Sequence, residues 1–246
     1  MTPIALQLYT LRDDLARDFD SMIEKIAALG FTGVESASFA GTTVKAAAQK
    51  FKDLGLTVCG AHLPLPVGER QAEVLEAMQI LDCRRLVCAS QPRELFQSAA
   101  GIRQVCDRLN EASAVAKSHG LTLGYHNHDF EFGRVDGRLA HEILRDCLSP
   151  DIFFELDTYW VQTAGVDAAA VLRELGPRVP LVHLKDGPAV RGKPMQAFGE
   201  GVMDIPALVK ASTGHAEWLI IELDECATDM FEAVRRSYDY LAKLGG

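Results

Sequence analysis

The segment Leu121–Phe132, LTLGYHNHDFEF, concentrates side chains that can bind a metal ion or transfer a proton. Its first half has the character of a β-strand, in which successive side chains alternate between two faces. His126 and His128 therefore share one face, and Glu131 follows just past the end of the strand. A buried histidine is more often a hydrogen-bonded core residue than a metal ligand. This segment alone leaves both interpretations open.

Three further apolar segments carry groups of the same kind at or near their ends. FFELD closes with Asp157, LVHLKD contains His183 and LIIELDE contains Glu222. Four such segments, spread over about a hundred residues of the chain, indicate a shared binding site rather than four separate packing features.

The elements that would position these groups alternate along the whole chain. The strands are expected at 4–9, 32–36, 57–62, 84–90, 121–128, 152–157, 180–185 and 218–223. The helices are expected at about 19–29, 43–54, a segment ending near 81, 99–119, 138–147, 167–175, 205–212 and 230–244. Each strand and helix unit has the size of a βαβ repeat.

Strands joined through helices run parallel, and a parallel sheet needs cover on both of its faces. A closed eight-stranded (β/α) barrel and an open doubly wound sheet both meet this need. We favour the α/β fold with a single (β/α)8 TIM barrel, because polar residues recur at the ends of the whole set of strands rather than at one switch point. Without any Ser-, Pro- or Gly-rich linker, residues 1–246 are expected to form one domain.

In such a barrel the chemistry lies at the C-terminal mouth of the strands. The strand ends bring the following residues there: Gln7, Tyr9, Glu35, His62, His126, His128, Glu131, Asp157, His183, Lys185, Glu222 and Asp224. Burying an unpaired charge costs several kcal/mol, so Glu131, Asp157 and Glu222 require a cation. Three carboxylates and an imidazole suit one divalent ion, with Mn²⁺ or Mg²⁺ favoured and Co²⁺ or Zn²⁺ able to compete.

Composition excludes several other classes of protein. The net charge of −9 opposes broad binding to nucleic acid or to an anionic membrane. The first residues, MTPIALQLYTLRDD, lack the basic and apolar regions of a secretory signal, and no apolar run is long enough to span a membrane. The six cysteines form no CxxC pair, so we expect reduced, buried thiols and a cytoplasmic protein. A homo-oligomer remains open.

The motifs together resemble the xylose-isomerase-like (β/α) barrel superfamily, in the branch called sugar phosphate isomerases/epimerases. The resemblance covers essentially the whole chain. It rests on the segments ALQLYTLRD, GFTGVE, GYHNHDFEF, ELDTYWV, VHLKD, FGEGVMDIPAL and IIELDE.

The resemblance implies a metal site made of an acid on the fifth strand, Asp157, His183 and Glu222. For the fifth strand either Glu131 or His126 could serve, and we favour Glu131. Of the residues at the strand ends, we expect substrate contacts from Gln7, Tyr9, Glu35, His62 and Asp224. Trp160 is also expected to bind substrate, and the resemblance places it where the sugar epimerases carry a substrate-binding histidine. That difference indicates a substrate other than a ketohexose.

The leading hypothesis is a divalent-metal-dependent isomerase or epimerase of a sugar, polyol ketone or related hydroxyketone, which acts through a metal-stabilised enediolate. Glu222 would be both ligand and general base, with Glu131, His126 or His128 as its partner and Lys185 as a further catalytic group. A lyase or dehydratase acting on a keto-sugar or ketoinositol would use the same metal site. An apurinic-endonuclease-like nuclease and a non-catalytic barrel are the remaining alternatives.

The segment from Lys185 to Met203 is rich in Gly and Pro and is expected to form a lid or substrate clamp. Its cations, Lys185, Arg191 and Lys193, could bind a phosphate or carboxylate group of the substrate.

Overall fold

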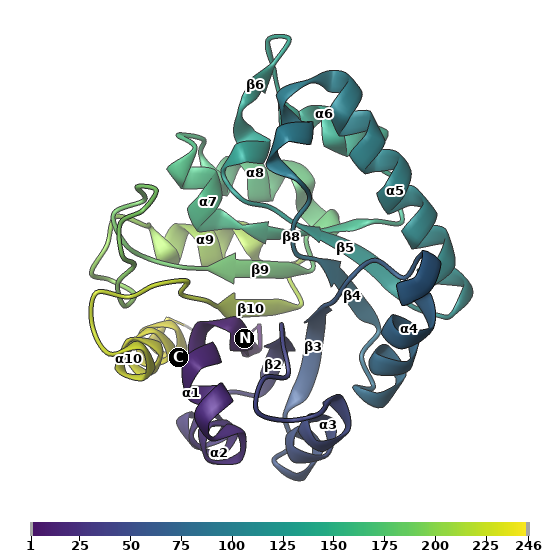
Figure 1. Ribbon diagram of the computed structural model, residues 1–246. Helices are drawn as coiled ribbons and strands as arrows, with labels where there is room; N and C mark the ends of the chain where they lie inside the picture. Colours follow the sequence, from purple (N-terminus) through teal and green to yellow (C-terminus); the bar gives the residue numbers. More distant parts are fainter. Residues whose placement is uncertain (1, 245–246) are drawn as a thin grey trace.

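A closed barrel of eight parallel strands forms the centre of the molecule in the computed structural model, which describes residues 2–244 (Figure 1). The barrel strands are β1 (Ile4–Gln7), β2 (Gly33–Ser36), β3 (Thr57–His62), β4 (Arg85–Cys88), β5 (Thr122–His126), β8 (Phe153–Asp157), β9 (Leu181–Leu184) and β10 (Trp218–Ile221). The predicted single (β/α)8 TIM barrel is confirmed. Of the domain expected over residues 1–246, residues 1, 245 and 246 lie outside the described residues.

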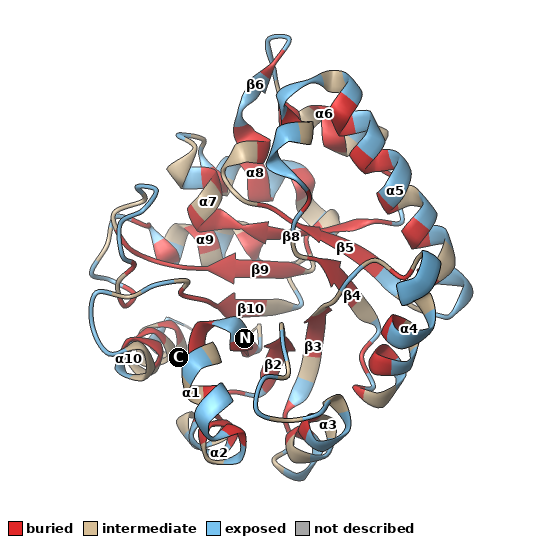
Figure 2. Cartoon of the chain, in the orientation of Figure 1, coloured by how far each residue is buried: buried red, intermediate tan, exposed pale blue. Residues whose placement is uncertain are grey.

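Ten α-helices, as far as residues 2–244 show, lie around the outside of the barrel. They are α1 (Arg12–Arg17), α2 (Phe19–Leu29), α3 (Val44–Asp53), α4 (Gln71–Ile80), α5 (Ala99–Ser118), α6 (Ala140–Cys147), α7 (Thr158–Thr163), α8 (Ala168–Leu175), α9 (Ile205–Ser212) and α10 (Met230–Lys243). Figure 2 shows that the barrel strands are mostly buried, with exposed residues at the start of β3 and β5, whereas the outer helices carry both buried and exposed residues around their axes. The helices thus provide the cover that a parallel sheet requires.

Helix ends follow local sequence signals. The side chain of Asp18 accepts a hydrogen bond from the backbone N–H of Ser21 and caps the start of α2. Gly30 ends the same helix in the left-handed conformation, with φ of 105°. These two signals explain why the bounds expected for this helix are those observed.

The barrel interior has an apolar layer at the N-terminal end of the strands and a polar layer above it. The lower layer contains Ala5, Cys59, Val87, Phe153, Leu181 and Ile220, packed with Trp218. Because side chains alternate along a strand, the residue two positions further on also points inward. The polar residues Gln7, Glu155, His183 and Glu222 follow the lower layer at this spacing. The alternation therefore places the site on a packed apolar base.

The expected elements lie within two residues of the observed bounds, and two of the differences have a visible cause. Strand β1 ends at Gln7, and Leu8–Leu11 forms a 3₁₀ helix in which the Gln7 side chain accepts a hydrogen bond from the backbone N–H of Tyr9. The helix expected from residue 138 begins at Ala140, because Arg138–Leu139 (β7) pairs antiparallel with Arg134–Val135 (β6) in a small hairpin. Neither difference moves a barrel strand.

The barrel closes where the two ends of the described chain meet. Strand β1 pairs parallel with β10, and Figure 1 shows the yellow α10 beside the purple α1 and α2. The hydroxyl of Tyr238 donates a hydrogen bond to the carbonyl oxygen of Gly30 at 2.8 Å. All six cysteines are free thiols. Among residues 2–244 there is no helix with the length and apolar character needed to cross a membrane.

Candidate metal centre

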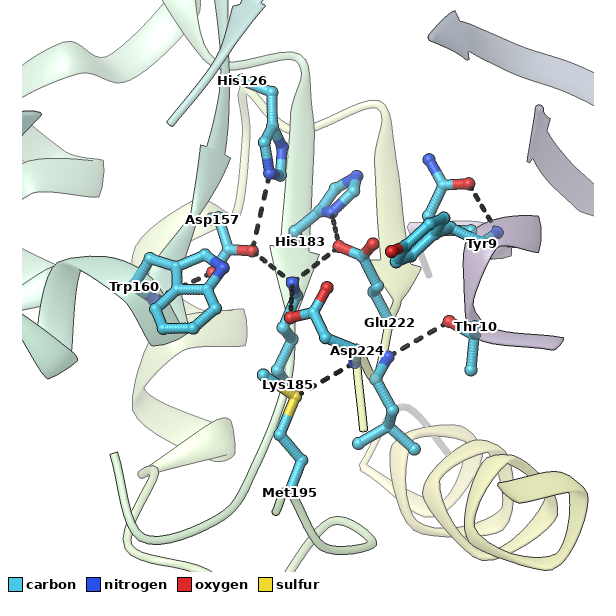
Figure 3. Close-up of polar contacts among 12 residues, drawn as sticks. Tyr9, Thr10, His126, Asp157, Trp160, His183, Lys185, Met195, Glu222 and Asp224 are labelled. Atoms are coloured by element: carbon cyan, nitrogen blue, oxygen red, sulfur yellow. Dashed lines mark hydrogen bonds and ion pairs between the residues drawn. The ribbon is translucent and has the colours of Figure 1, made fainter. Parts of the chain in front are cut away.

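Four side chains converge at the C-terminal mouth of neighbouring strands (Figure 3). His126 ends β5, Asp157 ends β8, His183 lies in β9 and Glu222 follows β10. All four are buried, and one potential ligand atom from each lies within 4.8 Å of the others. We call these four residues the outer group. Two imidazoles and two carboxylates form a mixed N/O donor set that suits a divalent transition metal.

Lys185 lies against the outer group from the end of β9. Its Nζ atom is 2.9 Å from Oδ2 of Asp157, 2.8 Å from Oε2 of Glu222 and 2.8 Å from Oδ2 of Asp224 (Figure 3). The side chain is only 1% exposed. Burial opposes a charge on His183, yet Glu155, Glu35 and Glu222 hold its pKa well above the usual value. Even with that imidazolium, three carboxylates around one ammonium leave negative charges uncompensated. A divalent cation would balance them, so the residues present fit a metal ion.

Backbone contacts fix the orientation of Asp157. Its Oδ1 accepts a hydrogen bond from the backbone N–H of Trp160 at 2.9 Å and caps the start of α7. The side chain of Asn127 pairs with the backbone of Asp157, accepting from its N–H at 3.0 Å and donating to its carbonyl oxygen at 3.2 Å. Oδ2 of Asp157 is thereby directed toward the other three residues of the outer group. Asn127 is not among the site residues predicted from the sequence, although it lies inside the YHNH motif.

A second set of polar residues lies deeper in the barrel, and we call Gln7, Glu35, His62 and Glu155 the inner group. Oε2 of Glu155 is 2.6 Å from Nε2 of His62, and Oε2 of Glu35 accepts a hydrogen bond from Nε2 of Gln7 at 2.7 Å. Gln7, Glu35 and Glu155 have no exposed surface. Glu155 is not among the site residues predicted from the sequence. Its position two residues before Asp157, on the same face of β8, was the available signal.

The two groups touch through the rings of His126 and His183. Nδ1 of His126 is 3.0 Å from Oε2 of Glu155 in the inner group. Nδ1 of His183 is 2.7 Å from Glu222, while its Nε2 is 2.7 Å from Glu35. These contacts create another cluster whose donor atoms could hold a metal ion, made of His62, His126, Glu155 and His183.

Burial and neighbouring charges shift the pKa values of these residues in different directions. Burial raises the pKa of Asp157 to about 6, and the ammonium of Lys185 limits the rise. Burial also acts to raise the pKa of Glu222, but Lys185 and His183 hold it below its usual range. For Lys185, burial favours the neutral form, yet Asp157, Glu222 and Asp224 keep its pKa well above the usual value. Glu222 and Lys185 are thus charged at neutral pH.

Glu131 belongs to neither group. It lies in the 3₁₀ turn Phe130–Phe132 after β5, where its carboxylate accepts hydrogen bonds from the hydroxyl of Tyr125 at 2.7 Å and from the backbone N–H of His128 at 2.9 Å. Burial raises its pKa to about 7. The structure thus brings His126, rather than Glu131, next to Asp157, His183 and Glu222.

A cavity of about 810 Å³ opens beside the outer group. Tyr9, His62, His126, His128, Glu222 and Asp224 line its polar end, and Leu63, Leu65 and Val67 line an apolar side. Of the other predicted substrate-binding residues, Gln7 and Glu35 are buried in the inner group, and the ring of Trp160 lies 6.2 Å from that of His128. A volume of this size lies in the range of pockets that enclose small organic ligands.

The loop between β9 and α9 is organised around the buried carboxylate of Asp186. This carboxylate accepts hydrogen bonds from four backbone N–H groups, those of Gly187, Gly199, Gly201 and Met203. A Cβ atom on Gly201 would lie 2.1 Å from Oδ1 of Asp186, so this close approach requires glycine. The loop is held in place where it adjoins the site.

The three cations proposed for binding a phosphate or carboxylate have different surroundings. Lys185 is buried among the site carboxylates. Arg191 forms an ion pair with Asp129, with 2.8 Å between Nε and Oδ2, and Lys193 is exposed. Two of these cations thus already have anionic partners within the protein.

The sequence matches the model of one protein family, whose fold agrees with the observed barrel. A model of the family described as xylose isomerase-like TIM barrel matches residues 23–244. The chain belongs to this family. No curated protein matches it by sequence.

Solved structures with the same fold include enzymes of sugar metabolism. A sugar phosphate isomerase/epimerase from Parabacteroides distasonis ATCC 8503 superposes with a TM-score of 0.82 and 21% identity, covering 99% of this chain and 98% of its own. The structure of an L-ribulose 3-epimerase gives a TM-score of 0.72 and 18% identity, with 99% and 94% covered. The probable 3-DHS dehydratase involved in petrobactin synthesis from Bacillus anthracis gives 0.75 and 12%, with 98% of each chain covered. The structural neighbours of this chain thus include proteins described as a sugar phosphate isomerase/epimerase, an L-ribulose 3-epimerase and a probable dehydratase.

Proposed function

We propose that this chain is a divalent-metal-dependent isomerase or epimerase that acts on a sugar or a related hydroxyketone, with Mn²⁺ as the favoured metal. The observation that carries the proposal is the outer group of two imidazoles and two carboxylates beside an 810 Å³ cavity. Its residual negative charge supports a divalent ion, and its mixed N/O donors favour Mn²⁺ over Mg²⁺. The isomerases and epimerases among the structural neighbours support the reaction class.

In this proposal His126, Asp157, His183 and Glu222 hold the metal, and Glu131 does not. When bound, the ion supplies a Lewis acid that polarises the carbonyl of the substrate and lowers the barrier to removing a proton from the adjacent carbon. Asp157 and His183 are oriented by contacts with Trp160 and Glu35, so the ligands need little rearrangement.

Glu222 and His128 are the proposed proton-transfer residues. Glu222 lines the cavity and stays ionised, because Lys185 and His183 outweigh the effect of burial on its pKa. His128 also lines the cavity, and burial together with the charge of Lys185 lowers its pKa to about 4. His128 is therefore neutral at pH 7 and can accept a proton. Two bases on different elements could act on two faces of one substrate.

The test uses proton exchange rather than a known product. The Mn²⁺-loaded protein is incubated in D₂O with a panel of ketoses and keto-sugars, free and with apolar substituents, and the C–H signal beside each carbonyl is followed by NMR. We expect exchange with at least one member, and a loss of about 10²-fold or more in Glu222→Gln. Glu217→Gln, which changes an exposed glutamate paired with Arg85, is the matched control. Full exchange by Glu222→Gln would exclude Glu222 as the base.

A lyase or dehydratase is the second candidate, and Asp224 favours it. This carboxyl lines the cavity beside Lys185, and burial raises its pKa even though the ammonium opposes the rise. A carboxyl of raised pKa could protonate a leaving hydroxyl group after the first proton has been removed. Mass analysis of products from the same panel separates the two reactions, because a dehydratase product has lost one water and an isomerase product has not.

A further inference from the structure

The rings of His126 and His183 each face both groups of polar residues, with one nitrogen toward each. For His126, Nδ1 is 3.0 Å from Glu155 and Nε2 is 3.9 Å from Oδ2 of Asp157. For His183, Nε2 is 2.7 Å from Glu35 and Nδ1 is 2.7 Å from Glu222. The two rings are therefore oppositely oriented between the same two layers.

A neutral imidazole has one N–H donor and one nitrogen with a free lone pair. An ionised carboxylate can only accept hydrogen bonds. With a metal ion bound by the outer group, the nitrogens that ligate it carry no proton. Hydrogen bonds to Glu155 and Glu35 then place the remaining protons on Nδ1 of His126 and on Nε2 of His183. The lone pairs then lie on Nε2 of His126 and Nδ1 of His183, which both face the outer group.

We propose that Glu155 and Glu35 are positioning residues of the metal centre: they hold His126 in the Nδ1–H form and His183 in the Nε2–H form, so that His126 binds the metal through Nε2 and His183 through Nδ1. This inference rests on the proposed metal centre, and it assigns to two buried glutamates a role in metal affinity. Carboxylates that accept a hydrogen bond from a ligand histidine fix its tautomer and orientation and raise its basicity.

The barrel interior holds both glutamates rigidly. Glu35 accepts a hydrogen bond from Gln7 at 2.7 Å, and Glu155 is 2.6 Å from Nε2 of His62. A Cβ atom at Gly60 would lie 2.4 Å from Oε1 of Glu35, so the absence of a side chain there makes room for this carboxylate. The backbone of Gly60 does not have a positive φ. Substitution by alanine would thus displace Glu35 without backbone strain.

The inner residues are a less suitable primary metal site than the outer ones. A metal bound by His62, His126, Glu155 and His183 would use the nitrogens that face inward. The ring of His126 or His183 could then also bind a metal in the outer group only by losing the proton on its other nitrogen. The outer group also includes Glu222, which lines the cavity, whereas Glu155 has no exposed surface. Of the inner group only His62 lines the cavity, so a metal held by the outer group is the one with a carboxylate ligand open to substrate.

The first measurement reads the tautomers directly in the parent protein. The chain is labelled with ¹⁵N-histidine and loaded with diamagnetic Zn²⁺, and the ring signals are assigned with single His126→Gln and His183→Gln variants. We expect a protonated Nδ1 in His126 and a protonated Nε2 in His183. The reverse tautomer in either ring would overturn the inference, whether or not any variant folds.

The second measurement is Mn²⁺ affinity, from calorimetric titration of metal-stripped protein. Glu155→Leu, Glu35→Leu and Gly60→Ala are each expected to weaken binding by about 10- to 100-fold, and Glu155→Gln, which retains an acceptor oxygen, by less. Glu217→Gln should bind as the parent does. Circular dichroism of each metal-free variant verifies the fold.

The outcomes separate the two proposals. If the parent binds about one ion and the variants bind equally tightly, the positioning role is wrong and the metal centre stands. If the parent binds two ions and Glu155→Leu loses one of them, the inner residues are ligands and the inference is overturned. If the parent binds no Mn²⁺, the proposed metal centre fails, and the positioning role fails with it.

Discussion

The ammonium of Lys185 lies 2.9 Å from Oδ2 of Asp157, so the candidate metal centre includes a buried cation of the protein itself. The same ammonium is 2.8 Å from Oε2 of Glu222. A divalent metal and this lysine would therefore share two carboxylates. Burial favours the protonated, neutral forms of Asp157 and Glu222, and the positive charges of the lysine and the metal together oppose that effect.

Replacement of Lys185 by methionine should destabilise the metal-free protein. The change leaves Asp157, Glu222 and Asp224 buried without their cation, and breaking such a pair costs about 3–5 kcal/mol. Urea unfolding with and without Mn²⁺ measures the effect, and saturating Mn²⁺ should stabilise the variant more than the parent. Lys117→Met, which removes an exposed pair with Asp151, should change the free energy of unfolding by less than about 1 kcal/mol. Equal losses in the two variants would contradict the buried-cation role.

The pKa of Glu131 predicts a specific pH dependence of stability. Burial raises it from 4.5 to about 7 in the folded protein, so the folded state holds a proton that the unfolded state releases between these values. The stabilisation is complete below pH 4.5 and is lost as pH rises through 7. At 1.36 kcal/mol per pH unit, this group contributes a decrease of about 3 kcal/mol in the free energy of unfolding.

Denaturant unfolding of the parent and Glu131→Gln at intervals from pH 5 to 8 measures this contribution. The variant cannot ionise at this position, so the difference in stability between variant and parent should move in favour of the variant as the pH rises. A difference that stays constant over the range would show that Glu131 titrates at its usual pKa.

Removal of the Asp186 carboxylate should loosen the loop that follows β9. Asp186→Ala leaves four backbone N–H groups without their acceptor, those of Gly187, Gly199, Gly201 and Met203. Hydrogen exchange across residues 187–203 should become faster, with the opening free energy lowered by at least about 2 kcal/mol. Asp204→Ala, which removes only the cap of α9, should increase exchange at the start of that helix alone. Unchanged exchange in Asp186→Ala would show that the loop is held by other contacts.

Trp160 should report metal binding by fluorescence. Its backbone N–H donates to the proposed ligand Asp157, and the centre of its ring is 5.5 Å from Nζ of Lys185. The other tryptophan, Trp218, packs into the apolar layer at the opposite end of the barrel. Titration with paramagnetic Co²⁺ should therefore quench the emission of Trp218→Phe strongly and that of Trp160→Phe weakly. Equal quenching in the two variants would place the ion elsewhere.

Much of the architecture was predictable because its signals are local. Apolar runs separated by amphipathic segments define a parallel sheet with helical cover, and Asp18 and Gly30 mark the ends of one helix directly. Alternation along the strands also predicts that Asp157, His183 and Glu222 reach one mouth, because parallel strands expose their C-terminal ends on the same side. The existence of a polar site at that mouth followed from the sequence alone.

Tertiary structure decided which residues of the site meet. After β5 the chain turns, and the carboxylate of Glu131 accepts a hydrogen bond from the hydroxyl of Tyr125. The side chain of Tyr125 lies on the face of β5 opposite to His126 and packs in the core outside the barrel interior. The pairing of Glu155 with His126 joins residues 29 positions apart, and that of Glu35 with His183 joins residues 148 apart. Periodicity gives the face on which a side chain lies. The atom that it contacts depends on barrel closure and on the turns after the strands, which arise from packing between distant segments.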